Sequence, residues 1–399
     1  MMIEMSAVEL ARGIAERRFG SREVVDAHIE RIEAVNPSLN ALVEPRFELA
    51  RCEADVADSL VAQGADLGPL HGVPCTIKEF FGVSGMRNTG GIYRHRERIA
   101  SEDATDVARL KAAGAIILGT TNAPEGGLWM ETDNKIYGRT SNPWDRKRTS
   151  GGSSGGEGAL VAAGASPVGL GSDVGGSIRI PAAFCGAVGH KPSGGLFPNT
   201  GHFPAAPAGN GAFLCTGPLV RRVEDLWPLI QILAGPDGRD PFCRAMSLGN
   251  PDDVKWSDLV VYPLETNGRQ GVRKNMREAV RSATDALRDR GATVREIELP
   301  RMKKAVDIWA AMLSEAAQVH YPEILGAPGE PVSPWLELLK GCVGRSDYTA
   351  ITMMIAGLDQ FAGRFEKTLA RLVEEGHALR AELDDLLGDR GVILHPSYG

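Results

Sequence analysis

The segment from residue 151 to residue 181 interleaves serine with glycine, and its serines are Ser153, Ser154, Ser172 and Ser177. Flexible linkers are also rich in glycine and serine, but they stay polar throughout. Here the apolar residues within 159–163 are suited to burial, so the glycines belong to a core, where they allow close backbone approach. The run SDVGGS, which ends at Ser177, can bend several N–H groups toward one point, as an oxyanion site requires. We therefore predict an active site rather than a tether.

Three known motifs use glycine and serine in this way. The phosphate-binding pattern GxxxxGK is absent, and the dinucleotide pattern GxGxxG fails because Val174 stands where its third glycine belongs. The nucleophile elbow GxSxG does match at 151–155. An elbow must follow a buried strand, however, and residues 142–150 read as a polar loop. The α/β-hydrolase interpretation is therefore disfavoured.

Two longer stretches resemble the amidase signature family. Residues 141–193 match the family signature almost without a break, and LHGVPCTIKE at 70–79 matches its upstream lysine motif. Within the family, the segments KEFFGVSGMRNTGG and SDVGGSIRIPAAFCGAVGHKPS look most like the fatty-acid amide hydrolase 2 branch. The resemblance covers residues 5 to 220 and implies a serine amidase without a cofactor.

The resemblance implies a Ser–cis-Ser–Lys triad. Ser177 would be the nucleophile, Ser153 the bridging serine after a cis peptide bond from Gly152, and Lys78 the base. The oxyanion hole would be formed by the backbone N–H groups of Val174, Gly175, Gly176 and Ser177. The residue types agree, because amide hydrolysis needs an activated nucleophile, a proton carrier and donors aimed at the oxyanion.

Lysine can act as a base only in its neutral form, and its ordinary pKa is about 10.4. Burial disfavours the charged form and lowers this pKa. Val73, Ile77 and Phe80 are apolar neighbours of Lys78, so we expect its ammonium group to be poorly hydrated and its pKa to be lowered.

Several neighbours of the triad are expected to support it. We expect Asp173 and Arg179 to hold the nucleophile loop through an ion pair and hydrogen bonds, and Ser154 to form hydrogen bonds beside the bridging serine. Ser172 reads as an ordinary loop residue. Glu157 opens a helix and suits the positive end of the helix dipole.

The stretch 126–130 contains the candidate substrate-pocket residues Gly127, Leu128 and Met130. Its apolar side chains would suit an acyl or aryl group. They would equally suit packing in the core, and the sequence leaves both interpretations open.

Composition narrows the class of protein. The chain has 399 residues, 43% hydrophobic and 24% charged, and a net charge of −7, which argues against a nucleic-acid or anionic-membrane surface. Its six cysteines form no CxxC pair or metal-ligand spacing, and there is no HExxH motif, so no metal is expected. No apolar run approaches the roughly 20 residues that span a bilayer. We expect a cytoplasmic enzyme that acts on a small amide, with a homodimer as its candidate assembly.

The pattern along the chain predicts an α/β fold, with one large mixed sheet covered by helices, in a single amidase domain over 1–399. Its expected parts are N-terminal helices within 5–65, a catalytic core at 66–220 and a C-terminal α/β portion at 221–399. Asn36-Pro37 is expected to end the second helix. Short apolar runs beginning near residues 72, 115 and 167 predict buried strands. Further strands are predicted at 258–262, 293–297 and 391–394, with helices at 303–318 and 359–387 among the intervening elements.

The leading hypothesis is hydrolysis of a small carboxamide with an apolar acyl or aryl group, through an acyl-enzyme, releasing a carboxylate and ammonia or an amine. The alternative is the amidase subunit of a glutamine-dependent transamidation complex. A third possibility is a binding protein with an intact-looking site. Family members usually continue past the motif that resembles 392–396, so the chain is either short by nature or a fragment.

Overall fold

The computed structural model describes residues 2–205, 211, 213–316, 319–326, 329–360 and 366–398. The chain divides into two compact units. The first comprises Met1–Met246 and Val319–Gln360, and the second comprises Ser247–Gln318 and Phe361–Gly399. The chain therefore leaves the first unit, returns to it and leaves it again. The single amidase domain over the whole chain stays a prediction.

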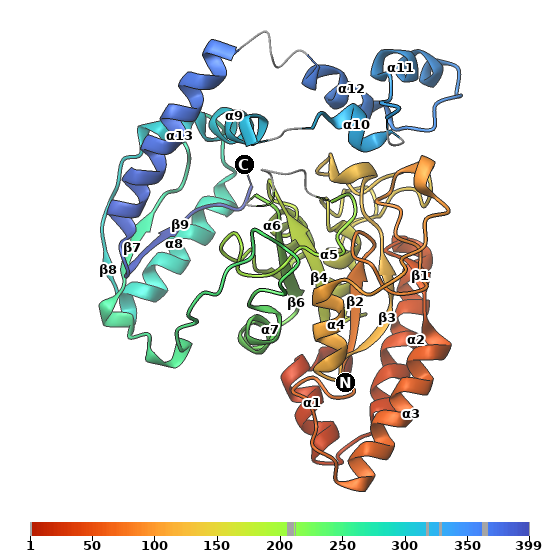
Figure 1. Ribbon diagram of the computed structural model, residues 1–399. Helices are drawn as coiled ribbons and strands as arrows, with labels where there is room; N and C mark the ends of the chain where they lie inside the picture. The colour runs from red at the N-terminus through yellow and green to blue at the C-terminus, as the bar shows by residue number, and fades with distance from the viewer. Residues whose placement is uncertain are drawn as a thin grey trace. The chain divides into compact units, whose positions relative to one another are not determined.

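The first unit is built around a six-stranded sheet in the order β1-β3-β2-β4-β6-β5 (Figure 1). Its strands are β1 (Leu42–Pro45), β2 (Pro74–Lys78), β3 (Ile116–Thr121), β4 (Val168–Asp173), β5 (Val188–Gly189) and β6 (Cys215–Val220). Strand β2 lies between β3 and β4 and runs parallel to both, whereas β1, β5 and β6 pair antiparallel with their neighbours. This mixed sheet with flanking helices confirms the predicted α/β class.

The helices of the first unit lie along this sheet and above it. They are α1 (Ala7–Ala15), α2 (Ser21–Leu39), α3 (Phe47–Gln63), α4 (Thr105–Ala112), α5 (Gly155–Ala162), α6 (Arg179–Cys185), α7 (Leu226–Leu233), α10 (Tyr321–Leu325), α11 (Pro334–Cys342) and α12 (Ala350–Asp359). Helices α2 and α3 run side by side (Figure 1). The apolar stripe of α2, Val25, Ile29 and Ile32, is buried in one cluster with Ile116 and Leu118 of β3. The stripe thus fixes the helix layer against the strand next to β2.

The second unit has a small parallel sheet of its own, in the order β8-β7-β9. Its elements are β7 (Val260–Pro263), β8 (Thr293–Val294), β9 (Gly391–Leu394), α8 (Lys274–Asp289), α9 (Ala305–Ala316) and α13 (Glu366–Leu387). The three late strands predicted from the sequence are therefore present, but they form a second sheet rather than extend the large one. Parts of the two predicted helices, at 317–318 and 361–365, lie outside the described residues.

Two local expectations for the N-terminal helices were wrong. Residues 42–45 form strand β1, which pairs with β3 through Leu42 opposite Thr121, and such a distant pairing leaves no local signal in four residues. Helix α2 continues through Pro37 to Leu39. It ends there because the side-chain oxygen of Asn36 accepts hydrogen bonds from the N–H groups of Ala41 and Leu42, 2.8 Å each, which turns the chain.

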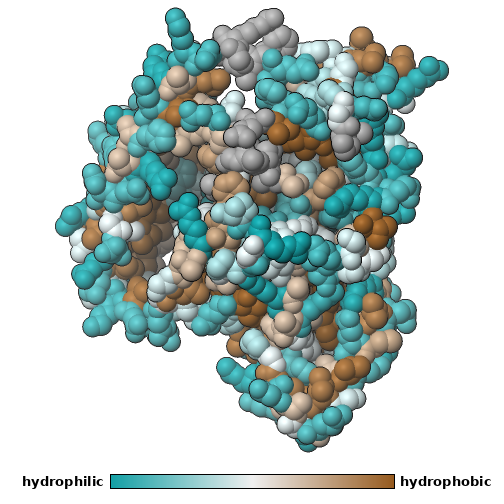
Figure 2. Space-filling model, viewed as in Figure 1, coloured by the Kyte–Doolittle hydropathy of each residue, from teal (hydrophilic) through white to brown (hydrophobic). Residues whose placement is uncertain are grey.

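The starts of α1 and α2 are capped differently. Ser6 caps α1, as predicted, in a reciprocal arrangement with Glu9. At α2 the predicted cap Ser21 is the first helical residue, and the carboxylate of Asp58 accepts from its N–H instead (2.6 Å). Hydrophilic and hydrophobic residues are intermixed on the visible surface of α1–α3, where Leu49 of α3 is among the exposed apolar residues (Figure 2).

Candidate active site

Lys78 is the last residue of β2, a strand whose five residues are all buried. Its Nζ lies 2.6 Å from Oγ of Ser153, 3.0 Å from Oγ of Ser172 and 4.4 Å from the ring centroid of Phe80. The side chain is 0% exposed. Burial lowers the pKa of Lys78 to about 7, although the charge of Asp173 acts in the opposite direction. A substantial fraction of this buried amine is therefore neutral near neutral pH.

Ser153 lies in a tight turn just before α5. The peptide bond between Gly152 and Ser153 is cis. A Cβ atom at position 152 would lie 2.7 Å from the carbonyl oxygen of Trp129, so only glycine fits there. The preceding residues form a loop with one isolated bridge, Ser141 with Thr149, and not a strand. The GxSxG match therefore lacks the strand that a nucleophile elbow requires.

Ser177 lies in the loop between β4 and α6, and it is half-buried. Its carbonyl oxygen accepts a hydrogen bond from the N–H of Ser154 (3.0 Å), which ties it to the residue after Ser153. Among the described residues, the Ser177 hydroxyl makes no hydrogen bond to protein. The structure thus holds the two loops together and leaves this hydroxyl available to a substrate.

The Ser177 loop is anchored by a buried carboxylate. Asp173, 0% exposed, accepts from the N–H of Gly176 (2.7 Å) and of Ile178 (3.0 Å), and from Nη2 of Arg179 (2.9 Å). Burial alone would raise the pKa of Asp173, but its ion pair with Arg179 and the backbone donors hold that pKa below its usual range. Gly176 has φ +121°, a conformation that favours glycine. The loop is therefore held in shape by charge and by backbone geometry together.

The predicted oxyanion donors are divided by this anchoring. The N–H of Gly176 is directed at Asp173. The N–H groups of Gly175 and Ser177 donate to no protein acceptor within the described part of the chain. Val174, half-buried, precedes them. The two N–H groups without a protein acceptor are those best able to receive an oxyanion.

Two residues at the site were missed by sequence reasoning. Ser172, read as a loop residue, is the penultimate residue of β4, and its hydroxyl lies between Nζ of Lys78 and Nε2 of His202 (2.9 Å). The sequence did hold a signal for Ser172, because neighbouring parallel strands such as β2 and β4 bring their carboxyl ends to one edge of a sheet. His202 carried no such signal, because it reaches the site through an isolated bridge to Phe81.

Ser154 and Glu157 support the site from beneath. The Ser154 hydroxyl donates to the carbonyl oxygen of Ser172 (3.2 Å). Glu157, expected only at a helix terminus, is fully buried and accepts from Oγ1 of Thr76 (2.6 Å) and of Thr121 (2.8 Å). Burial raises its pKa to about 8. Glu157 therefore links α5 to both β2 and β3, below Lys78.

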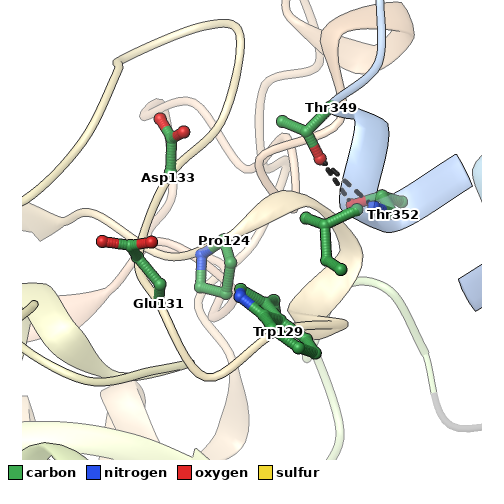
Figure 3. Close-up of a pocket in the computed structure, with 7 residues that line it drawn as sticks. Pro124, Trp129, Glu131, Asp133, Thr349 and Thr352 are labelled. Atoms are coloured by element: carbon green, nitrogen blue, oxygen red, sulfur yellow. Dashed lines mark hydrogen bonds between the residues drawn. The ribbon is translucent and has the colours of Figure 1, made fainter. Parts of the chain in front are cut away.

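A cavity of about 190 Å³ opens beside this region. Its lining residues are Pro124, Trp129, Glu131, Asp133, Thr349, Ile351 and Thr352 (Figure 3). Figure 3 shows the Trp129 ring and Pro124 on one wall, and the carboxylates of Glu131 and Asp133 on the loop that follows. Trp129 connects the cavity to the triad, since its backbone packs on Gly152.

The predicted pocket residues lie around this cavity but do not line it. Gly127 packs on Phe80, and a Cβ atom there would lie 3.9 Å from Oγ of Ser153. Leu128 packs against a buried apolar cluster that includes Leu325. Met130 is 38% exposed. Of the stretch 126–130, only Trp129 lines the cavity.

Metal sites and membrane-spanning helices are both absent from the described residues. No group of three or more His, Cys, Asp or Glu side chains suited to hold a metal ion occurs among them. None of the helices in these parts of the chain combines the length and the apolar character needed to cross a bilayer.

Comparisons with known proteins agree on one family. The family model described as Amidase matches residues 23–398. Fatty-acid amide hydrolase 2 of Homo sapiens is 40% identical over 417 residues, which cover 100% of this chain and 76% of that protein. The amidase-like chain of glutamyl-tRNA(Gln) amidotransferase from Roseiflexus sp. (strain RS-1) is 36% identical over 331 residues, or 80% of this chain and 67% of that one.

A solved structure shows the same fold. A bacterial aryl acylamidase of the amidase signature enzymes superposes with a TM-score of 0.79 at 26% identity, covering 98% of this chain and 79% of the acylamidase. The match to the family model and the identity to whole-length relatives lead to one conclusion: this chain belongs to the Amidase family, and it is a hydrolase of amide C–N bonds.

Proposed function

We propose that this amidase works through an acyl-enzyme, with Ser177 as nucleophile, Ser153 as proton relay and Lys78 as base. The observation that carries the proposal is the 2.6 Å contact between Nζ of Lys78 and Oγ of Ser153. It is supported by the hydrogen bond that joins Ser154 to Ser177, and by the pKa of about 7 that burial gives Lys78. A neutral amine is the form that can accept a proton.

The first half of the reaction forms an ester. As Oγ of Ser177 attacks the substrate carbonyl carbon, its proton passes to Oγ of Ser153 while the Ser153 proton passes to Nζ of Lys78. The tetrahedral intermediate then collapses, and the C–N bond breaks. The proton returns from Lys78 through Ser153 to the leaving nitrogen, which departs as ammonia or an amine. Water repeats the sequence on the ester and releases the carboxylate.

The developing oxyanion needs donors placed before the reaction begins. We assign this role to the N–H groups of Gly175 and Ser177, because each lacks a protein acceptor within the described residues. Val174 stays a predicted contributor. The N–H of Gly176 instead holds the loop through Asp173, so its contribution would be indirect.

For the substrate we propose a small carboxamide with an apolar acyl or aryl group. The cavity beside the triad offers Pro124, Trp129 and Ile351 as apolar walls. None of its described lining residues is basic, and Glu131 and Asp133 would repel the carboxylate of a free amino acid such as glutamine. The relatives named for fatty-acid amides and aryl acylamides are consistent with this choice.

A fluorophosphonate probe tests the nucleophile directly. We expect a single adduct on the peptide that contains Ser177, and no adduct in the Ser177→Ala variant. The matched Ser153→Ala variant should label slowly but at the same position. An adduct on the 151–156 peptide, with Ser177 unmodified, would overturn the triad and restore the GxSxG interpretation.

A panel of amides tests the substrate class. We expect aryl and fatty acyl amides to give higher kcat/KM than glutamine or asparagine. Glutamine as the best substrate, with other chains that copurify, would instead support the transamidation complex, in agreement with the amidotransferase relative. The cytoplasmic location and the homodimer stay predictions, which a tagged chain and light scattering would test.

A further inference from the structure

His202 is a buried imidazole with a defined tautomer. It is 8% exposed, and its Nδ1 lies 2.8 Å from the carbonyl oxygen of Pro204. A carbonyl oxygen can only accept, so Nδ1 must carry a hydrogen. Burial lowers the pKa of His202 to about 3, so the ring is neutral and Nε2 carries no hydrogen. Nε2 is therefore an acceptor.

This tautomer fixes the direction of the Ser172 hydroxyl. Oγ of Ser172 lies 2.9 Å from Nε2 of His202 and 3.0 Å from Nζ of Lys78. A serine hydroxyl has one hydrogen to donate. Because Nε2 can only accept, the hydrogen goes to His202, and Ser172 must accept from Lys78.

The direction of that bond determines where the lone pair of Lys78 can be used. A neutral amine has two N–H groups and one lone pair. One N–H is directed at Ser172, which has no hydrogen left to offer in return. The remaining hydroxyl in contact with Nζ is that of Ser153, at 2.6 Å. The lone pair can therefore accept only from Ser153.

We propose that His202 and Ser172 are positioning residues that orient the amine of Lys78, so that its lone pair receives the proton from Ser153. The inference rests on the proposed role of Lys78 as the base. The His202 ring itself is held edge-on by Phe80 and Phe81, with ring centroids 5.5 and 5.0 Å away. Its orientation is thus set by packing as well as by the hydrogen bond to Pro204.

Removing the acceptor at Nε2 releases the Ser172 hydroxyl. It can then turn and donate to the lone pair of Lys78, in competition with Ser153. Such a bond stabilises the neutral amine and lowers the pKa of Lys78. The plateau rate should fall and the ascending limb of the pH profile should move to lower pH. Asp173 and Glu157, the charged groups that act on Lys78, are retained in every variant.

Four variants test the arrangement. His202→Phe keeps an aromatic ring without an acceptor, whereas His202→Gln offers an amide oxygen to Ser172 without the ring. Ser172→Ala removes the acceptor that faces Lys78, and the double variant His202→Phe/Ser172→Ala asks whether the two residues act as one unit. Thermal unfolding identifies any variant that fails to fold, in which case Ser172→Ala and His202→Gln decide the question.

We expect His202→Phe and Ser172→Ala each to lower the plateau kcat on the order of ten- to a hundred-fold, with KM little changed. The limb of kcat/KM should move to lower pH in both. His202→Gln should recover most of the rate, and the double variant should be no slower than Ser172→Ala.

Several outcomes would overturn the proposal. They are an unmoved limb, a His202→Gln variant as slow as His202→Phe, and rate losses that multiply in the double variant; each points to a merely structural role. Lys78→Met, measured in the same assay, separates this failure from failure of the mechanism. If Lys78→Met is inactive while His202→Phe retains the wild-type rate and limb, Lys78 remains the base and only the positioning role is lost.

Discussion

Nζ of Lys78 lies 2.6 Å from Oγ of Ser153, and both side chains are buried at the carboxyl end of the central strand β2. A lysine in this position is useful to the enzyme only when it has lost its proton. The first prediction follows from that requirement.

The pH profile should report the titration of Lys78. Because the pKa of Lys78 is lowered to about 7 by burial, kcat/KM should rise with pH and level off above roughly pH 8. Lys78→Met, which fills the apolar site without a base, should lower the rate by about 10²–10⁴-fold and flatten the limb. Lys147→Met, at an exposed lysine, is the matched control and should be silent. Wild-type rate and limb in Lys78→Met would exclude lysine as the base.

The anchor of the nucleophile loop should matter for stability. Asp173→Asn keeps the size of the side chain but removes the charge that three donors face, at an expected cost on the order of 1–3 kcal/mol in free energy of unfolding. The exposed-pair variant Asp55→Asn is the control, with an expected cost of about 0–1 kcal/mol.

This loss should depend on pH in a defined sense. Since the folded pKa of Asp173 lies below its usual value of about 3.9, the carboxylate stabilises the protein above that pH, and the effect is lost as pH falls through the folded pKa. The Tm difference between wild type and Asp173→Asn should be constant near neutrality and narrow below about pH 4. A gap that widens on acidification would contradict the assignment.

The buried acid Glu157 should behave in the opposite way. Burial raises its pKa to about 8, so the folded state favours the protonated form, and stability is lost as pH rises from the unfolded value of about 4.3 toward 8. Glu157→Gln stays neutral and can still bond Thr76 and Thr121. Its Tm should therefore gain on that of the wild type between pH 5 and pH 8. An advantage that does not change with pH would show that Glu157 is ionised throughout this range.

Trp129 should contribute to recognition of the apolar group. Trp129→Ala removes one wall of the cavity and should lower kcat/KM for aryl amides about 5- to 30-fold, equivalent to about 1–2 kcal/mol of apolar contact. Small aliphatic amides should be affected less. Trp256→Ala, at another exposed tryptophan of the chain, serves as the control. Equal losses for every amide would place Trp129 in the support of Gly152 rather than in the pocket.

The central part of the fold could be predicted from the sequence because its signals are local. The apolar run that ends at Lys78 and the run before Ser172 indicated strands, and the apolar neighbours of Lys78 predicted its burial, now 0% exposed. Strand 391–394 was also located correctly. That it joins a separate sheet depends on pairing with 260–263, which local pattern does not encode.

The same limit explains what was missed at the site. Strand β1 exists because it pairs with β3, more than 70 positions along the chain. His202 contributes through an isolated bridge and an imidazole tautomer, neither of which leaves a periodic signal. Glu157 looked like a helix-terminal charge because its two threonine partners come from other strands.

The path of the chain through the first unit bears on how the protein is made. Residues 319–360 return to that unit only after 247–318 have been synthesised. They bring Leu325 and Met353 to the apolar cluster of Ile92, and they bring Thr349, which donates to the buried Glu125 (2.9 Å). A nascent chain that has reached only Met246 therefore has the triad residues but an unfinished cavity wall and exposed apolar surface. The ribosome must pass residue 360 before the substrate cavity can close around anything.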